Sequence, residues 1–496
     1  MLTISRQLAK QIRSVFRRAL QISASQTDQV VWLVGDDSGL RIRTQNWRAT
    51  AEYHLSGSPG AMNSGSIPVT MEALAACEGM KSDELVQMEK FDDESVVLHW
   101  NDRSVPQSFR LDAKILRPDP APVLPEKWGS NSPRLLTALN DAMKIVPADG
   151  TRYALNCVQL RPEGGRLAAT DGHQLLVEHG FEFPWQGDAL VPRTKVFDGR
   201  ELPSDLHVEI GLTPNHAVFR AGPWTFWLTL EKQGRFPTVE NIIPTANSVK
   251  TRLYLSAEDM SFMLDVVPRL PSETDQQGRI TLDLNGQVAL LAKGDGPAPV
   301  TQVVLRNSQR NGDEVRLNTD RQFLVRAAQL GFHEFELHGS ESPVVCRDER
   351  RIYLWSVLEE AAALTTGPDT VQLESPLATT TSPAAARPLP PPRRARATPE
   401  RNPNPMSHNR IAETLAASAP TPASESAPPP PNHNGDHDHR GSFNAILQQA
   451  ETAKTSLHDA FTKINHLIGS LKRHRRQSKL MQTTLASLKQ LQNLEV

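Results

Sequence analysis

The stretch LAATDGHQLLVEHG, from Leu167 to Gly180, sets the tetrapeptide Thr-Asp-Gly-His between two apolar runs. An Asp-Gly pair is typical of a tight turn, because glycine adopts positive φ without steric cost. The pattern predicts two antiparallel strands joined by a polar turn. That turn has three interpretations: a catalytic pair of Asp171 and His173, a corner of a metal site, or part of a binding surface. Catalysis is disfavoured, because the two side chains project in diverging directions and no serine or cysteine nucleophile motif accompanies them.

This strand–turn–strand unit belongs to a longer repeat. Over residues 1–366 a helix-like segment followed by short strand-like segments recurs about six times. The helix-like segments are 5–21, 68–77, 132–146, 190–199, 256–270 and 318–329. Short turns between the strands indicate antiparallel meanders rather than parallel βαβ units. The repeat predicts an α+β fold of three tandem domains, each of two half-repeats, at residues 1–120, 128–247 and 250–366.

The remainder of the chain has a different composition. Residues 367–440 are rich in Pro, Ala, Ser and Thr, which predicts a disordered linker. Within it, the His- and Asp-rich tract Asn432–Arg440 is either a weak metal binder or a solvated part of the linker. Apolar residues then recur at helical spacing over 441–496, which predicts a helical, coiled-coil tail. The basic run Leu471–Lys479 interrupts that tail and is either a contact to DNA or acidic protein, or a solvated face.

Composition limits the possible partners. The formal charge is −2, from 54 basic and 56 acidic residues, so a nucleic-acid partner has to rely on a local basic patch. The cysteines, Cys77, Cys157 and Cys346, lie far apart without CxxC spacing, which predicts a reduced protein without a zinc site or disulfides. No apolar run is long enough to span a membrane. We therefore expect a cytoplasmic protein with no membrane partner.

Three motifs together resemble one known family. The stretches RYALNC (Arg152–Cys157), ATDGH (Ala169–His173) and GRFP (Gly234–Pro237) are similar to those of the bacterial DNA polymerase III β subunit, the sliding clamp. The likeness is best over 128–360, and the first domain matches by pattern only. It implies a head-to-tail homodimeric ring that encircles double-stranded DNA without reading its sequence and tethers a polymerase. Such a processivity factor is not an enzyme and needs no cofactor or metal.

The resemblance also implies a cleft between the second and third domains that binds short linear peptides of polymerase and clamp-loader subunits. The residues that would line it are Leu155, Thr170, Gly172, His173, Leu175, Pro237, Ile242, Asn318 and Val344. An apolar cavity with a few polar groups suits a peptide anchor. The chain departs from the family at Gln174, which replaces an arginine, and at Cys157, which replaces a glycine. It also lacks the family's Met-Pro-Met-Arg-like tail, for which Leu354, Trp355 and Val357 are candidate substitutes.

A basic stripe predicts the contact with DNA. In the first helix Arg6, Lys10, Arg13 and Arg17 fall at i, i+4, i+7 and i+11, a spacing that holds phosphates without reading bases. The further candidates, on other helices, are Arg193, Lys195, Arg200, Arg321 and Arg326. The alternative is a merely solvated helix face.

Two further hypotheses follow from the C-terminal region. QLESPL, Gln372–Leu377, is similar to the Gln-Leu-x-Leu-Pro-Leu type of peptide that clamps bind, so it either caps the chain's own cleft or matches by chance. The leading function, a sliding clamp, competes with a clamp-fold scaffold that has no replicative role and recruits partners through its helical tail. An enzyme ranks third, because no nucleophile, metal cluster or phosphate loop is present in the sequence.

Overall fold

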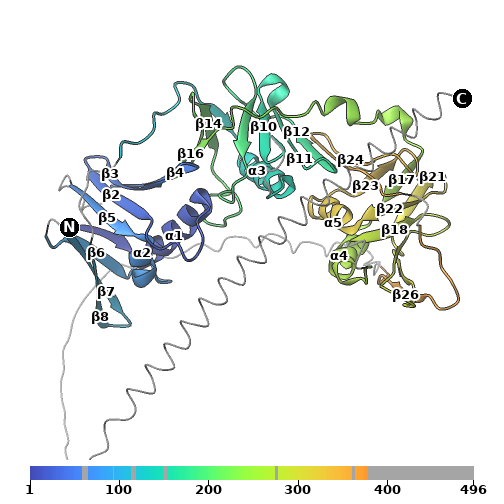
Figure 1. Cartoon of the computed structure of the whole chain (residues 1–496), viewed down its shortest axis with the longest axis horizontal. Helices are drawn as coiled ribbons and strands as arrows, with labels where there is room; N and C mark the ends of the chain where they lie inside the picture. The colour runs from blue at the N-terminus through green and yellow to red at the C-terminus, as the bar shows by residue number, and fades with distance from the viewer. Residues whose placement is uncertain are drawn as a thin grey trace, which may run out of the picture. The chain divides into compact units, whose positions relative to one another are not determined.

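The computed structural model describes residues 1–57, 65–92, 94–112, 119–148, 154–273, 278–359 and 363–377, all within the compact unit Met1–Pro388. The coiled-coil tail, the His- and Asp-rich tract and most of the predicted linker lie outside these residues. Within them, no helix is both long and apolar enough to cross a membrane. The described part is an α+β structure of many short strands and few helices (Figure 1).

The first domain shows the repeating unit clearly. In order, its elements are β1 (Leu2–Ser5), α1 (Arg6–Leu20), β2 (Val30–Asp36), β3 (Gly39–Gln45), β4 (Ala49–Ser56), β5 (Gly65–Thr70), α2 (Met71–Cys77), β6 (Leu85–Lys90), β7 (Ser95–Asp102) and β8 (Val105–Asp112). Each half is a leading strand, a helix and a three-stranded meander. The leading strand joins the other half's meander: β1 pairs with β6, and β5 pairs with β2. This exchange ties the two halves into one domain.

Sequence explains the long first helix. The Ser5 hydroxyl accepts a hydrogen bond from the Leu8 N–H and so caps the first turn of α1. Ile12, Val15 and Phe16 are completely buried on one face, as the 3.6-residue period requires. The helix ends at Gln21, whose φ of 53° lies in the left-handed region.

The second domain repeats the plan with one exception. Its elements are β9 (Gly129–Asn131), α3 (Arg134–Ile145), β10 (Cys157–Arg161), η1 (Glu163–Gly165), β11 (Arg166–Thr170), β12 (Gln174–Glu178), β13 (Ala189–Pro192), β14 (Val208–Leu212), β15 (His216–Ala221), β16 (Trp224–Thr229), η2 (Glu240–Ile242) and η3 (Ala246–Ser248). The leading strands again exchange: β9 pairs with β14, and β13 with β10.

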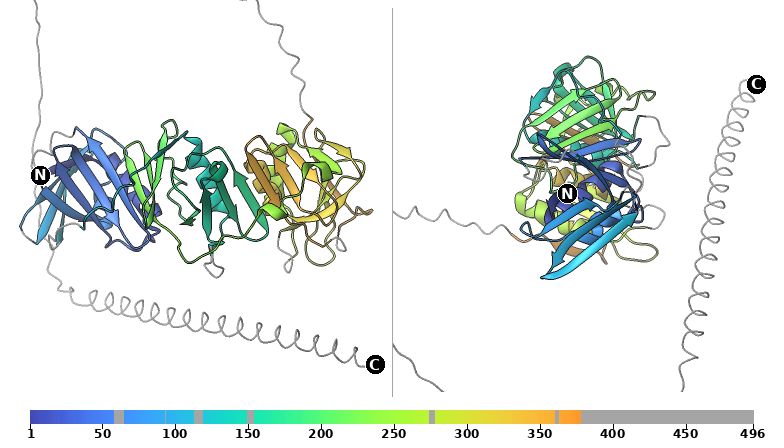
Figure 2. Two further views of the ribbon diagram at one scale, coloured as in Figure 1. Left: turned by 90° about the horizontal axis from the view of Figure 1, so that it is seen from above. Right: turned by 90° about the vertical axis from the view of Figure 1, so that its left-hand side faces the viewer.

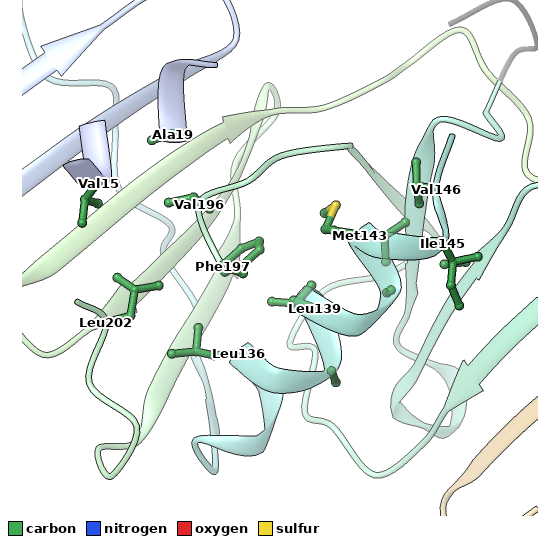
Figure 3. Close-up of a cluster of buried hydrophobic side chains, with 14 of the residues drawn as sticks. Val15, Ala19, Leu136, Leu139, Met143, Ile145, Val146, Val196, Phe197 and Leu202 are labelled. Atoms are coloured by element: carbon green, nitrogen blue, oxygen red, sulfur yellow. The ribbon is translucent and has the colours of Figure 1, made fainter. Parts of the chain in front are cut away.

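The helix predicted at 190–199 is wrong. Its first residues belong to β13, and an irregular segment without an α-helix leads from there to β14. Pro192 cannot supply a helical N–H, and Asp198-Gly199 favours a turn. The segment nevertheless packs into the core as a helix would. Its buried side chains Val196, Phe197 and Leu202 lie in the same cluster as residues of α3 and α1 (Figure 3).

The third domain follows the plan and adds a strand. Its elements are β17 (Thr251–Tyr254), α4 (Ala257–Val266), η4 (Val267–Arg269), β18 (Arg279–Asp283), β19 (Ala289–Ala292), β20 (Thr301–Val304), β21 (Gln309–Gly312), β22 (Arg316–Asp320), α5 (Arg321–Gln329), β23 (Glu334–Leu337), β24 (Val344–Arg347), β25 (Arg351–Trp355) and β26 (Val371–Glu374). Because β26 pairs in parallel with β20, the predicted linker does not begin at residue 367. Residues 363–377 are part of the third domain's structure.

Antiparallel strand pairs join the domains into continuous sheets. At the first junction β4 pairs with β16, and at the second β12 pairs with β25 (Figures 1 and 2). The first pair completes an eight-stranded sheet and the second a nine-stranded sheet. Each domain therefore continues into the next through backbone hydrogen bonds, which places the Thr170–His173 turn beside the end of β25, the third domain's last meander strand.

Candidate partner-binding site

The Thr170–His173 turn is held by its own polar groups. Gly172 has a φ of 93°, which a side chain would strain. The Thr170 hydroxyl donates to the Gln174 carbonyl at 2.6 Å and accepts from the Gly172 N–H at 3.1 Å. One oxygen of Asp171 accepts from the backbone N–H groups of His173 and Gln174, at 2.8 and 2.9 Å. The carboxylate thus serves the turn, which leaves the His173 ring exposed at its tip.

Side chains and backbone of the third domain meet this turn directly. The Tyr353 hydroxyl donates to the side-chain oxygen of Gln174 at 2.8 Å, and the Gln174 side-chain N–H donates to Asp171 at 2.8 Å. Directly after β25, the Ser356 N–H donates to the His173 carbonyl at 2.8 Å. Gln174 therefore takes part in the inter-domain junction at the position where the resembled family carries arginine.

Beside the turn lies a second apolar cluster, separate from the main core. We call it the outer cluster; it consists of Ala154, Cys157, Ala168, Leu175, Val177, Leu190, Phe236, Val239, Val345 and Leu354. Ile243 and Ile352 pack against it and are only partly buried. Burial within this cluster raises the pKa of the Cys157 thiol to about 12. The cluster combines residues of the second domain, the connector that follows it, and the third domain.

The outer cluster includes Leu175 but not Val344. Successive residues of a strand face opposite sides of a sheet. On β24 and β25, Val345 and Leu354 face the outer cluster, whereas Val344 and Trp355 belong to the main core. The assignment of Val344 to the cleft is wrong by one residue, because a shift of one exchanges the two faces. Trp355, a candidate substitute for the missing tail, is likewise a core residue.

The assignment of Asn318 to the cleft is also corrected. It lies on β22, in the third domain's other sheet, and is completely buried. Its side-chain oxygen accepts from Thr281 at 2.6 Å, and its side-chain N–H donates to the Glu359 carbonyl at 2.7 Å. Its carbonyl accepts from the Leu358 N–H. Asn318 therefore positions the segment after β25 and does not line the cleft.

The remaining predicted cleft residues, which we call the rim, are not members of the outer cluster. Leu155 is half-buried, and Pro237 and Ile242 are exposed on the connector between the second and third domains. Pro237 also borders a polar cavity of about 770 Å³ in the second domain, next to Arg161 and Glu240. Among the described residues, the rim thus contains exposed apolar side chains, whereas the outer cluster is buried.

A carboxylate fixes the connector to the sheet. One oxygen of Glu240 accepts from Arg161 at 2.8 Å and from Arg166 at 2.5 Å. A hydrogen bond from its own backbone N–H, followed by that from Arg166, lowers the pKa of Glu240 to about 2. Further along, the Arg347 guanidinium of β24 donates to the Pro244 carbonyl. Sequence reasoning missed these residues, because nothing in their spacing marks them as partners; the one signal was that Glu240 follows the GRFP motif by three residues.

Half of the basic stripe on α1 is neutralised by carboxylates. Arg6 is buried, and its guanidinium bonds Glu84 at 2.7 Å and Asp102 at 3.1 Å. Arg13 pairs with Glu78 at 2.6 Å. These contacts remove Arg6 from the predicted DNA contact, since helical periodicity cannot tell an inward basic residue from an outward one. Lys10 and Arg17 remain, without an ion pair among the described residues.

The predicted DNA contacts outside α1 also divide into residues bonded within the protein and residues that are exposed. Arg321 is buried and donates to the carbonyls of Leu270 and Pro271, so it holds the end of the α4–η4 segment and is not a phosphate contact. The Arg326 guanidinium donates to the Lys144 carbonyl across the second junction. Arg193 donates to the Met143 carbonyl. Lys195 and Arg200 are exposed.

QLESPL does not reach the outer cluster. Residues Gln372–Glu374 lie in β26 on the β20 edge, which belongs to a different sheet from β12 and β25. Figure 1 shows β26 well away from β11 and β12. The hypothesis that this segment caps the cleft is therefore wrong.

Comparison with solved structures identifies the architecture. The DNA polymerase III β subunit of Pseudomonas aeruginosa is 20% identical with a TM-score of 0.59, covering 72% of this chain and 99% of that one. The Bacillus subtilis sliding clamp is 17% identical with a TM-score of 0.58, covering 72% of this chain and 98% of its own. The chain has the sliding-clamp fold. No protein-family model matches the sequence, and no curated protein matches it either.

The sliding-clamp fold accounts for the sixfold repeat and for the two sheet junctions. A further similar structure is a P. aeruginosa sliding clamp bound to griselimycin, 18% identical with a TM-score of 0.59, again covering 72% of this chain and 99% of that one. Within the described residues, no group of three or more His, Cys, Asp or Glu side chains is placed to hold a metal ion.

Proposed function

We propose that the chain is a sliding clamp, a non-catalytic processivity factor whose two copies close around duplex DNA and tether a polymerase. The observation that carries this proposal is the fold, which spans nearly the whole length of the compared β subunits. Each domain joins the next by an antiparallel strand pair, so a further pair of the same kind between two copies is the natural way to continue and close the assembly.

The outer cluster and its rim are the proposed docking site for short linear peptides of polymerase and clamp-loader subunits. An apolar floor offers the pocket, and the exposed Ile242, Pro237 and His173 at the rim offer contacts that a peptide would cover. The Gln174–Tyr353 hydrogen bond keeps the two domains in register beneath it.

The contact with DNA is proposed to be loose. Arg6, Arg13 and Arg18 are paired with carboxylates, so α1 presents only Lys10 and Arg17 as cations without an ion pair among the described residues. A ring needs no tight phosphate grip, because topology retains it. The same neutralisation favours the rival proposal, a clamp-fold scaffold without a replicative role, because a scaffold needs no DNA contact at all.

Retention on circular DNA separates the two proposals. The full chain is loaded onto nicked circular DNA, freed from unbound protein by gel filtration in high salt, and then treated with a single-cutting restriction enzyme. A clamp stays on the circle in high salt, which screens phosphate contacts, and leaves when the DNA is cut. A scaffold elutes without DNA from both forms. Protein that remains bound after cutting contradicts topological tethering.

A further inference from the structure

The internal junctions show which strands are built to pair across domains. Each meander ends on one strand, and the six are β4, β8, β12, β16, β20 and β25. Four of these pair across the two junctions, β4 with β16 and β12 with β25, always antiparallel. The two that remain are β8 in the first domain and β20 in the third. By the rule of the internal junctions, β8 of one copy and β20 of another are the edges that would meet.

The β8 and β20 edges differ in whether another strand already pairs with them. Among the described residues β8 pairs only with β7, and most of its side chains are exposed. The β20 edge is already occupied by the chain itself. There β26 runs parallel to β20 with Thr301 opposite Val371 and Val304 opposite Glu374. A strand edge has one row of N–H and C=O groups, so β26 and a second copy cannot both use it.

Specific contacts position the segment that covers the edge. A turn over Gly367–Thr370 leads into β26, closed by the Thr370 N–H to the Gly367 carbonyl at 3.1 Å. The Val371 N–H then donates to the Val300 carbonyl, and the Ser375 N–H to the Val304 carbonyl, both at 2.9 Å.

The far end is anchored by side chains. Ser375 is only 1% exposed, and its hydroxyl accepts from the Arg306 N–H at 2.9 Å. The Asn307 side chain donates to the Pro376 carbonyl at 2.8 Å and is itself held by the buried Asp259. The loop after β20 thus holds the end of the segment through specific hydrogen bonds, which a chance contact between the two would lack.

The stabilisation of β26 on the β20 edge is nevertheless small. Val371 is 48% exposed and Leu373 is 40% exposed, so the strand buries little apolar surface. Its attachment depends on a few backbone hydrogen bonds, each worth about 1 kcal/mol net, on the Ser375 and Asn307 contacts, and on an exposed ion pair between Arg306 and Glu374 at 3.0 Å. Such a segment can be displaced by a longer strand that adds side-chain contacts.

We propose that residues 371–377 are a cap on the ring-closing edge, and that β8 of a second copy must displace them from β20 before the ring closes. The cap lowers the fraction of chains competent to associate and so weakens association by that fraction. This inference rests on the proposed clamp function, and it adds that ring closure is gated by the chain's own C-terminal segment.

Two proline substitutions in the full chain test the cap. Alternate residues of a strand direct their N–H groups to the same neighbour, so Leu373, like Val371 and Ser375, donates toward β20 whereas Gln372 does not. Leu373→Pro removes that donor, and Gln372→Pro is the matched control. By sedimentation equilibrium, Leu373→Pro should dimerise roughly tenfold more tightly than the natural chain, and Gln372→Pro within about twofold of it.

A reversible lock gives the opposite test. Thr301→Cys with Val371→Cys places two thiols on facing residues of β20 and β26, within the reach of a disulfide. The natural cysteines are buried and do not compete. The oxidised chain should stay monomeric, and reduction should restore the natural association constant.

Equal association constants for Leu373→Pro and the natural chain overturn the cap, as does dimerisation of the oxidised double-cysteine chain. The DNA-cutting measurement is independent of both. A chain that is released only when circular DNA is cut, but whose association ignores Leu373→Pro, is a clamp without this cap. A chain that is never retained on circular DNA contradicts the clamp itself.

Discussion

Ile242 and Ile243 are adjacent in the sequence but differ in their packing. Ile243 packs against the outer cluster, whereas the Ile242 side chain is 50% exposed on the rim. An exposed apolar side chain beside an apolar floor is a contact that a peptide anchor would cover, at a gain of about 1.5–3 kcal/mol for a fully buried isoleucine.

Ile242→Ser should therefore weaken binding of a Gln-Leu-x-Leu-Pro-Leu peptide by about tenfold or more in a fluorescence titration. Leu206→Ser is the matched control, since Leu206 is 45% exposed elsewhere on the second domain. Its affinity should equal that of the natural chain. Equal losses in both variants, or none in Ile242→Ser, would place the peptide away from the outer cluster.

Prediction of single residues from the sequence depended on the element that carries them. Leu175 was carried over from the family likeness, two residues after a motif that fixes its strand, and it lies in the outer cluster. Val344 came from the likeness alone, and an error of one residue on β24 turned it to the core. Arg6 was predicted from helical spacing, which fixes a face but not whether carboxylates such as Glu84 cover it.

Charge holds the connecting segment around η2. Glu240 ties it to β10 and β11 through Arg161 and Arg166. Its pKa falls from 4.5 to about 2 in the folded chain. A carboxyl whose folded pKa lies below its unfolded pKa contributes stability above the unfolded value, and that stability is lost as the pH falls toward the folded value. The contribution is therefore present above about pH 4.5 and disappears toward about pH 2.

Urea unfolding at a series of pH values measures this effect. Between about pH 5 and about pH 3, Glu240→Gln should lose less unfolding free energy than the natural chain, by under about 1 kcal/mol because the carboxylate is partly exposed. Glu163→Gln is the control, since Glu163 has no ion pair among the described residues and should follow the natural chain. Parallel curves for all three proteins would show that Glu240 does not hold the connector.

Helices and strands were predictable where periodicity was long and uninterrupted. The spacing of α1 fixed both its extent and its buried face. The segment 190–199 also carried apolar residues at short spacing, but Pro192 and the register of β13 against β10 outweighed them. The parallel strand β26 was not predictable, because its partner β20 lies about 70 residues earlier and its own composition is that of a linker.

The chain as a whole follows from repetition. One unit of strand, helix and meander, used six times with exchanged leading strands and without the helix in the fourth unit, produces three domains, and strand pairs of one kind join them. The repeat therefore predicted an α+β fold, and the structure has the clamp fold although pairwise identity to the compared clamps is only 14–20%. Which edges stay open cannot be read from the repeat, because that depends on the segment after the last domain.

The claim that two copies close into a ring is tested most directly by mass and shape together. Light scattering and negative-stain imaging are applied to the full chain carrying Leu373→Pro, which frees the β20 edge. Ring closure predicts particles of twice the mass of one chain, with a central opening wide enough for a DNA duplex. Particles of one chain at every concentration, or two-chain particles without an opening that are joined through residues 441–496, would contradict it.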